Sequence, residues 1–125
     1  MAVVPGMGTP ISAIAGEDLS AYQYNLVKLN TSGQLEHFDA ITDIPCGVLQ
    51  NAPLSGEVGS FIPLGSGQSK IALGATLNPG VRFSGSAAGL AVAAAGTAFC
   101  AGILLEGGAN GELGVAILAP LQAAP

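Results

Sequence analysis

The chain has 125 residues, enough for one domain with a hydrophobic core. It contains three Lys or Arg and eight Asp or Glu, which gives a formal net charge of −5. This charge argues against binding to a nucleic-acid backbone. Charged residues make up only 9% of the chain, against about 25% in an ordinary soluble domain. We therefore expect partner proteins to cover much of the surface, with a neutral Gly/Ser/Thr-rich monomer as the alternative.

The first fifteen residues predict an extended arm. Their composition does not fold alone but can add a strand to the sheet edge of a neighbouring subunit; a disordered terminus is the alternative. The arm residues that we expect to make this contact are Val3, Val4, Pro5, Ile11 and Ile14. The segment lacks the positive region and the uninterrupted apolar stretch of a secretory signal, so we expect the protein to fold in the cytoplasm.

Residues 16–65 predict short strands separated by turns. Lys28 lies between Val27 and Leu29, and such alternation with period two is typical of a half-buried strand. The sequence Asn-Thr-Ser-Gly at 30–33 follows where a hairpin would reverse.

Residues 74–118 repeat this pattern. Arg82 lies between Val81 and Phe83, and the sequence Ser-Gly-Ser at 84–86 predicts the next turn. Both segments thus predict the same order of strands and turns, and neither is large enough to fold alone.

A gapless internal match supports a duplication. The sequence from Gly47, GVLQNAPLSGEVGSFI, aligns with that from Gly102, GILLEGGANGELGVAI. In the shared Gly-Glu-apolar-Gly unit the first Gly permits a positive φ, and the Glu can accept backbone N–H bonds or face solvent. The residues to which we assign this structural turn are Gly56, Glu57, Gly59, Gly111, Glu112 and Gly114.

These segments predict one all-β domain over residues 16–120, followed by a tail at 121–125. Two similar β units, related by an approximate two-fold, would form either a compact β-barrel or a two-sheet β-sandwich.

The uncharged residues 90–105 are too short and too rich in Ala and Gly for a membrane span, which needs about 20 strongly apolar residues. The aligned residues 35–49 carry charges, so we expect a buried or interface strand, with a helical turn at 93–95 as the alternative.

No motif predicts catalysis, a metal site or a cofactor. His37 is the sole histidine and lies between acidic neighbours, as a solvated loop residue would. A zinc site would need four ligands at recognisable spacing, and a nucleophile elbow would need G-x-S-x-G; the sequence contains neither. Cys46 and Cys100 are offset by one position in the repeat alignment, which favours two free thiols over a disulfide.

The motifs resemble those of the capsid cement, or head decoration, proteins of tailed bacteriophages. The resemblance covers nearly all of residues 15–120, and the 102–120 unit of Gly, apolar run, Gly-Glu and a final apolar strand is the most similar part. It implies an all-β subunit, commonly a homotrimer, that is made in the host cytoplasm and sits on the outer capsid surface. There it would clamp subunits of the major capsid protein at three-fold and quasi-three-fold positions.

Three other classes of function compete with this interpretation. A receptor-binding or carbohydrate-binding β module would offer exposed aromatic rings, and this chain has Tyr22 and Tyr24. An enzyme is disfavoured because no catalytic constellation is present. A small-ligand β-barrel would be defined by a cavity, which sequence does not reveal.

Overall fold

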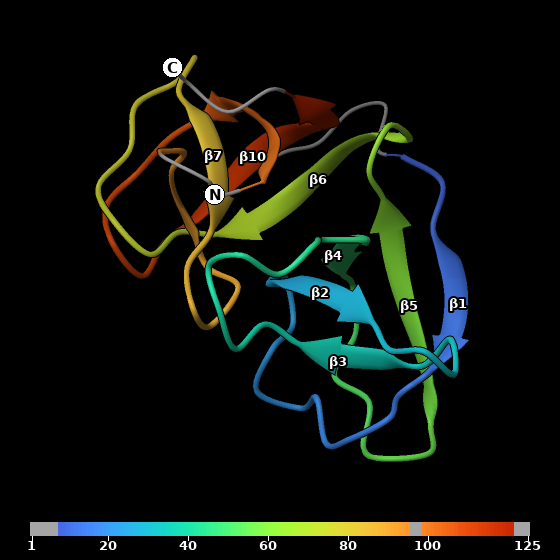
Figure 1. Ribbon diagram of the computed structural model, residues 1–125. Helices are drawn as coiled ribbons and strands as arrows, with labels where there is room; N and C mark the ends of the chain where they lie inside the picture. The colour runs from blue at the N-terminus through green and yellow to red at the C-terminus, as the bar shows by residue number, and fades with distance from the viewer. Residues whose placement is uncertain (1–7, 96–98, 122–125) are drawn as a thin grey trace.

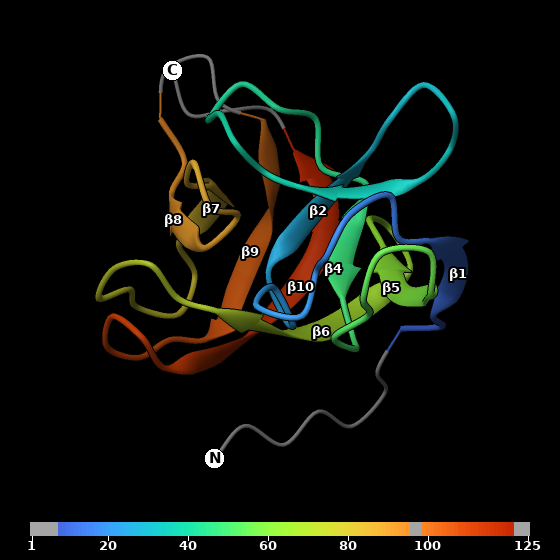
Figure 2. The same cartoon turned by 90° about the horizontal axis from the view of Figure 1, so that it is seen from below.

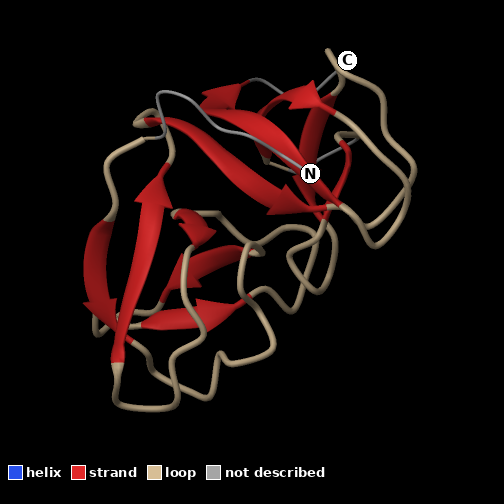
Figure 3. Ribbon diagram, turned by 180° about the vertical axis from the view of Figure 1, so that it is seen from behind, coloured by secondary structure: helices blue, strands red, loops and turns tan. Residues whose placement is uncertain are grey.

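The computed structural model describes residues 8–95 and 99–121 of the chain. Within these residues the protein forms ten β-strands and no helix, and all strand pairs are antiparallel (Figure 3). The expected all-β fold is confirmed, and its sheets form a two-sheet sandwich that does not close into a barrel. The alternative of a helical turn at 93–95 is wrong, because Ala91–Ala93 is a strand.

The first sheet is built entirely from the first half of the chain (Figure 1). Its strand order is β1-β5-β4-β2-β3. The strands are β1 (Ile11–Ile14), β2 (Leu26–Leu29), β3 (Leu35–His37), β4 (Gly47–Leu49) and β5 (Val58–Pro63).

The second sheet is built from the second half and has the order β6-β10-β9-β7-β8. Its strands are β6 (Gly67–Ala72), β7 (Arg82–Gly85), β8 (Ala91–Ala93), β9 (Cys100–Glu106) and β10 (Leu113–Leu121). Renumbering β6–β10 as the first to fifth strand of their unit reproduces the order of the first sheet. The fold is therefore made of two similar β units, as the sequence match predicts.

Both units begin earlier than the sequence predicts. Ile11–Ile14 lies within the predicted arm but forms β1, an edge strand whose residues all pair with β5. Gly67–Ala72 forms the equivalent β6 and pairs with β10. Part of the predicted arm, Ile11–Ile14, is thus a strand of the first sheet, because it pairs with a distant strand that the sequence does not show. The arm residues Val3, Val4 and Pro5 lie outside the described residues, as does the tail from residue 122.

Opposite faces of the first sheet serve two different parts of the core. Leu26, Val48 and Ile62 are paired across β2, β4 and β5 and join a core cluster with the second sheet. Their neighbours along each strand point the other way, since side chains alternate in a strand. That second face, with Val27, Leu49, Phe61 and the covering Leu19, forms a separate cluster inside the first unit.

The two units pack head to tail. The row Leu26–Val48–Ile62 meets the face of the second sheet that carries Phe83, Leu104 and Ala116. Figure 2 shows the strands of the two sheets that lie against each other. These three residues are equivalent to Val27, Leu49 and Phe61, so opposite faces of the two units meet. The approximate two-fold expected from the duplication is therefore wrong, because a two-fold would bring equivalent faces together.

Candidate interaction surface

The face of the second sheet that points away from the first sheet is apolar and partly open. Ile103 pairs with Ile117 across β9 and β10, and Ile117 is 42% exposed. Leu105 is 46% exposed and Leu113 is 42% exposed, while Val115 on the same face is buried. We call these five residues the outer face. Three half-exposed apolar side chains gathered on one sheet face indicate a surface for protein contact.

Basic residues flank the outer face. Arg82 pairs with Ile103 from β7, and Lys70 pairs with Val115 from β6. The Lys70 ammonium also lies 5.9 Å from the ring centroid of Tyr24. Residues 66–125 hold these two basic residues and two acidic ones, whereas residues 1–65 hold one basic and six acidic residues. The negative charge of the chain is therefore concentrated in the first unit.

Exposed apolar residues also lie on the first sheet. Ile11 on β1 is 50% exposed and Leu29 on β2 is 46% exposed. Ile11 pairs with Phe61, and Leu29 follows Val27 by two positions, so both belong to the face whose centre is closed by Leu19. We call Ile11 and Leu29 the first-sheet rim. On the opposite face, Ile14 pairs with Val58 and both are exposed.

The duplicated Gly-Glu turns are built in the same way in both units. Gly56 has φ +84° and Gly111 has φ +90°, a region that favours glycine. Glu57 Oε1 accepts a hydrogen bond from the Leu54 N–H at 2.7 Å, and Glu112 Oε1 accepts one from the Ala109 N–H at 2.6 Å. These carboxylates hold their own turns, which is a structural role.

The second glycine of each turn unit is buried. A Cβ on Gly59 would lie 2.6 Å from Leu35 Cδ1, and one on Gly114 would lie 2.6 Å from the carbonyl oxygen of Glu106. Both positions therefore need the small residue for packing within the unit.

His37 is not the solvated loop residue that the sequence predicts. It ends β3, its Nδ1 is hydrogen-bonded to Glu17 Oε1, and its ring stacks on Tyr22 with centroids 4.8 Å apart. The acidic residue that holds it is distant in sequence, so the neighbours of His37 gave no sign of the contact. One face of Tyr22 is thereby occupied, which weakens the case for sugar stacking.

A polar cluster follows β3. Lys28 Nζ lies 3.1 Å from Asp39 Oδ1 and 3.1 Å from Asp43 Oδ2. The hydrogen bond to Asp39 is the largest cause of a raised Lys28 pKa. Burial alone would raise the pKa of Asp43, but hydrogen bonds from the backbone N–H groups of Asp39 and Ala40 and from Lys28 lower it to about 2. This cluster fixes the loop between β3 and β4.

The two cysteines are free thiols, Cys46 half-buried and Cys100 buried. Burial raises the pKa of the Cys46 thiol to about 12. A thiol of this pKa is almost entirely protonated at neutral pH and is a poor nucleophile.

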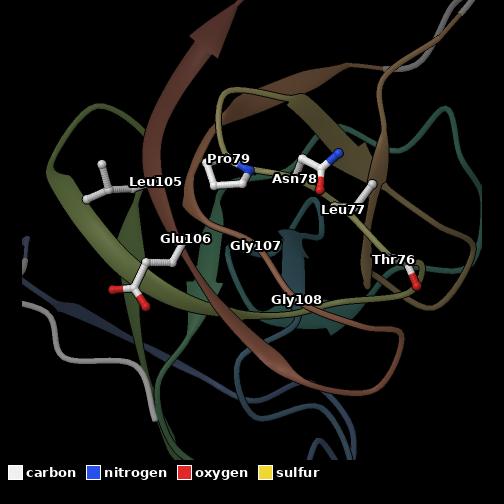
Figure 4. Close-up of a pocket in the computed structure, with 8 residues that line it drawn as sticks. All are labelled: Thr76, Leu77, Asn78, Pro79, Leu105, Glu106, Gly107 and Gly108. Carbon is white, nitrogen blue, oxygen red and sulfur yellow. The ribbon is translucent and has the colours of Figure 1, made fainter.

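A groove of about 470 Å³ lies between the β6–β7 loop and the end of β9 (Figure 4). Residues 76–79 and 105–108 line it, and Glu106 is the one charged residue among them. Among residues 8–95 and 99–121, no group of three His, Cys, Asp or Glu is arranged to hold a metal ion. The described part of the chain also contains no helix with the length and hydropathy needed to cross a membrane.

Comparison with known proteins finds a similar fold but no matching family. No protein-family model matches the chain, and no curated protein does. Among solved structures, the chain is similar to the N base of the head fiber gp8.5 of bacteriophage phi29, with 18% identity and a TM-score of 0.66. The similarity covers 93% of this chain and 99% of that one. The two proteins therefore share a fold over nearly their whole lengths.

Proposed function

We propose that the protein is a non-enzymatic structural protein of a phage virion that binds the outer surface of the head as a decoration, or cement, protein. The observation that carries the proposal is the shared fold with the base of a phage head fiber over 93% of the chain. The low charged fraction of 9% and the half-exposed outer face support it, because both suit a protein covered by partners.

In this proposal the protein is made in the host cytoplasm and assembles as a homotrimer. The trimer sits at three-fold and quasi-three-fold positions, where it clamps neighbouring subunits of the major capsid protein. Large apolar interfaces are typical of such permanent assemblies.

The test is a binding experiment with undecorated phage heads. The mass of the purified protein is measured by light scattering, and the protein is then mixed with heads and imaged by electron microscopy. We expect a trimer and added density at three-fold positions. Heads that stay bare at saturating protein would refute the decoration role.

The N-terminal residues offer a second test of the same proposal. We propose that Val3, Val4 and Pro5 contact a capsid subunit or an adjacent copy as an extended arm. Deleting residues 2–7 leaves β1 intact, so the shortened protein should fold as before but bind heads more weakly. Unchanged binding would exclude the arm.

A further inference from the structure

The described part of the chain begins beside β6, the edge strand of the second sheet. Gly8 is buried, and its N–H donates a hydrogen bond to the Gln68 carbonyl oxygen at 2.9 Å. A Cβ on Gly8 would lie 2.8 Å from Ile62 Cγ2 and 2.9 Å from the Ser66 carbonyl oxygen, so the backbone passes too close for a side chain. The position from which residues 1–7 extend is therefore fixed next to Gln68.

Gln68 lies on the same side of the second sheet as the outer face. It pairs with Ile117 across β6 and β10, and the side chains of directly paired residues point to the same side. Its Oε1 atom is buried, yet no donor among the described residues bonds to it. A buried oxygen without a donor is destabilising. This edge of the outer face thus lacks a hydrogen-bond donor, while Ile117 beside it is 42% exposed and lacks an apolar cover.

Residues 1–7 are long enough and apolar enough to supply both. Seven extended residues span about 23 Å, whereas β9 is two strand spacings from β6, about 10 Å. Their sequence, MAVVPGM, has no charged side chain, and five of its residues are Ala, Val or Met. Packing these side chains on Ile117 and Ile103 would remove apolar surface from water on both sides of the contact.

The free edge of β6 is the other place where these residues could lie, but most of it is occupied. Gly8 takes one end, and at the other end the Ala72 N–H donates to the Tyr24 carbonyl oxygen at 2.9 Å. Between them only Lys70 directs its backbone groups to this edge, since these groups alternate sides along a strand. The Lys70 carbonyl oxygen already accepts from Ser69 Oγ at 2.8 Å. The edge therefore offers no continuous row of free backbone groups to an added strand.

A turn directly before Gly8 would direct the chain away from the edge. Pro5 followed by Gly6 is typical of the two central positions of a type II β-turn. Such a turn brings Val4 within about 7 Å of the residue that precedes Gly8. Val4 is then within reach of Ile117 on the neighbouring strand.

We propose that in the free protein residues 1–7 fold back over the outer face of their own chain and cover Ile117 and Ile103. A backbone N–H of this segment supplies the donor that Gln68 Oε1 lacks. The occupant is this segment because its attachment at Gly8 holds it beside the face at an effective concentration on the order of millimolar.

This cover goes beyond the function proposed above and is compatible with it. The arm residues Val3, Val4 and Pro5 are held on their own chain in the free protein and leave the outer face when they contact a capsid subunit or an adjacent copy. The arm and the outer face therefore become available for binding together. Only this release rests on the proposed function; the cover itself does not.

A disulfide between the segment and the face tests the cover. In a background with Cys46→Ala and Cys100→Ala, Val4→Cys is combined with Ile117→Cys, and Val3→Cys with Ile117→Cys is made in parallel. Circular dichroism checks that the variants are folded. Under mild oxidation we expect at least one pair to lose its free thiols while it keeps the mass of one chain on a non-reducing gel. Free thiols in both pairs would overturn the proposal, and so would covalent dimers in place of the intramolecular bond.

The matched control for the disulfide is Val4→Cys with Val58→Cys in the same background. Val58 is 56% exposed, but it pairs with Ile14, which is six residues of chain from Gly8 and about 20 Å away when extended. Its thiols should therefore stay free under conditions that oxidise the Ile117 pair. Equally fast intramolecular oxidation of the control would overturn the proposal, because the segment would then favour no surface.

Deleting residues 2–7 tests the cover without cysteines. The deletion uncovers the outer face, so binding of the dye ANS, measured by its fluorescence, should rise several-fold over that of the wild type. Adding Ile117→Glu to the deletion should remove most of the increase, whereas adding Val58→Glu should not. Fluorescence that the deletion leaves unchanged would overturn the cover.

Head binding, measured separately, distinguishes this inference from the proposed function. Heads that stay bare with wild-type protein would refute the decoration role, while the disulfide and the dye, which need no heads, decide the cover. Where heads are decorated, the oxidised Val4→Cys, Ile117→Cys protein should bind as weakly as the deletion variant and regain binding on reduction. Equal binding of the oxidised and reduced forms would overturn the release of the arm.

Discussion

Ile62 and Ile117 occupy the same position in the two units, yet Ile62 is 0% exposed and Ile117 is 42% exposed. Each pairs with the equivalent residue of the neighbouring strand, Val48 or Ile103. Identical residues in identical secondary structure thus have different surroundings, because the units pack head to tail and only one of the two rows is covered by the other unit.

Replacing each isoleucine by alanine should lower the free energy of unfolding by different amounts in the two environments. Ile62→Ala leaves a cavity between the sheets and should lower the free energy of unfolding by about 2–5 kcal/mol. Ile117→Ala removes a half-exposed side chain and should cost about 1 kcal/mol in dilute solution. Urea denaturation of both variants at low protein concentration measures the difference. Equal losses would contradict the packing described for the two faces.

Gly47 and Gly102 should tolerate no side chain. A Cβ on Gly47 would overlap the carbonyl oxygen of Ile62, and one on Gly102 would overlap that of Ile117. Because the obstacle is the backbone of a paired strand, we expect Gly47→Ala and Gly102→Ala to cost about 3 kcal/mol each.

Gly33→Ala is the control for the glycine variants. Gly33 has φ +76°, but a Cβ there would meet no atom within 4 Å. Its substitution should therefore cost only the backbone strain, about 1–2 kcal/mol. Denaturant midpoints for the three variants test this order, and a larger loss for Gly33→Ala would contradict it.

The paired glutamates should contribute equally to stability. Glu57→Ala and Glu112→Ala each remove the acceptor for one turn N–H group, of Leu54 or Ala109, and should cost about 1 kcal/mol. Gln keeps an oxygen at the same place, so Glu57→Gln and Glu112→Gln should cost less than the alanine variants. Thermal unfolding of the four variants measures both effects. A large loss for one alanine variant alone would show that the two turns are not equivalent.

The parts of the fold that the sequence predicts are those fixed by local chemistry. Gly56 and Gly111 adopt a positive φ, so the turn between β4 and β5 demands the same residue as the turn between β9 and β10. Because both turns require glycine at this position, the two turn sequences stayed similar enough to align without a gap. The edge strands β1 and β6 have equivalent places but dissimilar sequences, ISAI and GQSKIA, and pairing with a distant strand defines both.

The arrangement of the two units could not be predicted, because it depends on which faces meet. Leu26 and Arg82 occupy equivalent positions, since Leu26 pairs with Val48 and Arg82 pairs with Ile103. The apolar Leu26 belongs to the row of side chains that the other unit covers, and the charged Arg82 belongs to the row that stays open. That difference has meaning only when the pairing is known. The exposure of Leu29 and Ile11 could not be predicted either, since an apolar residue in a strand pattern predicts burial.

The Asp43 carboxylate should make stability depend on pH in the acid range. Its pKa is lowered from 3.8 to about 2 in the folded protein. The folded state therefore binds the proton less readily than the unfolded state, so the stabilisation is full above about pH 5 and is lost as pH falls through 3.8 toward about 2. Asp43→Asn removes the charge that Lys28 and the N–H groups of Asp39 and Ala40 face, and should cost about 1 kcal/mol at pH 7.

Urea denaturation of the wild type and Asp43→Asn at pH 7, 4, 3 and 2 measures this effect. The difference between the two proteins should stay constant from pH 7 to 5 and shrink between pH 4 and 2, because the wild-type carboxyl becomes neutral like the amide. Asp39→Asn is the control: its side chain is 65% exposed, and an exposed ion pair contributes little, so the loss should stay below about 0.5 kcal/mol. A difference between wild type and Asp43→Asn that persists undiminished at pH 2 would mean that the charge of Asp43 does not stabilise this loop.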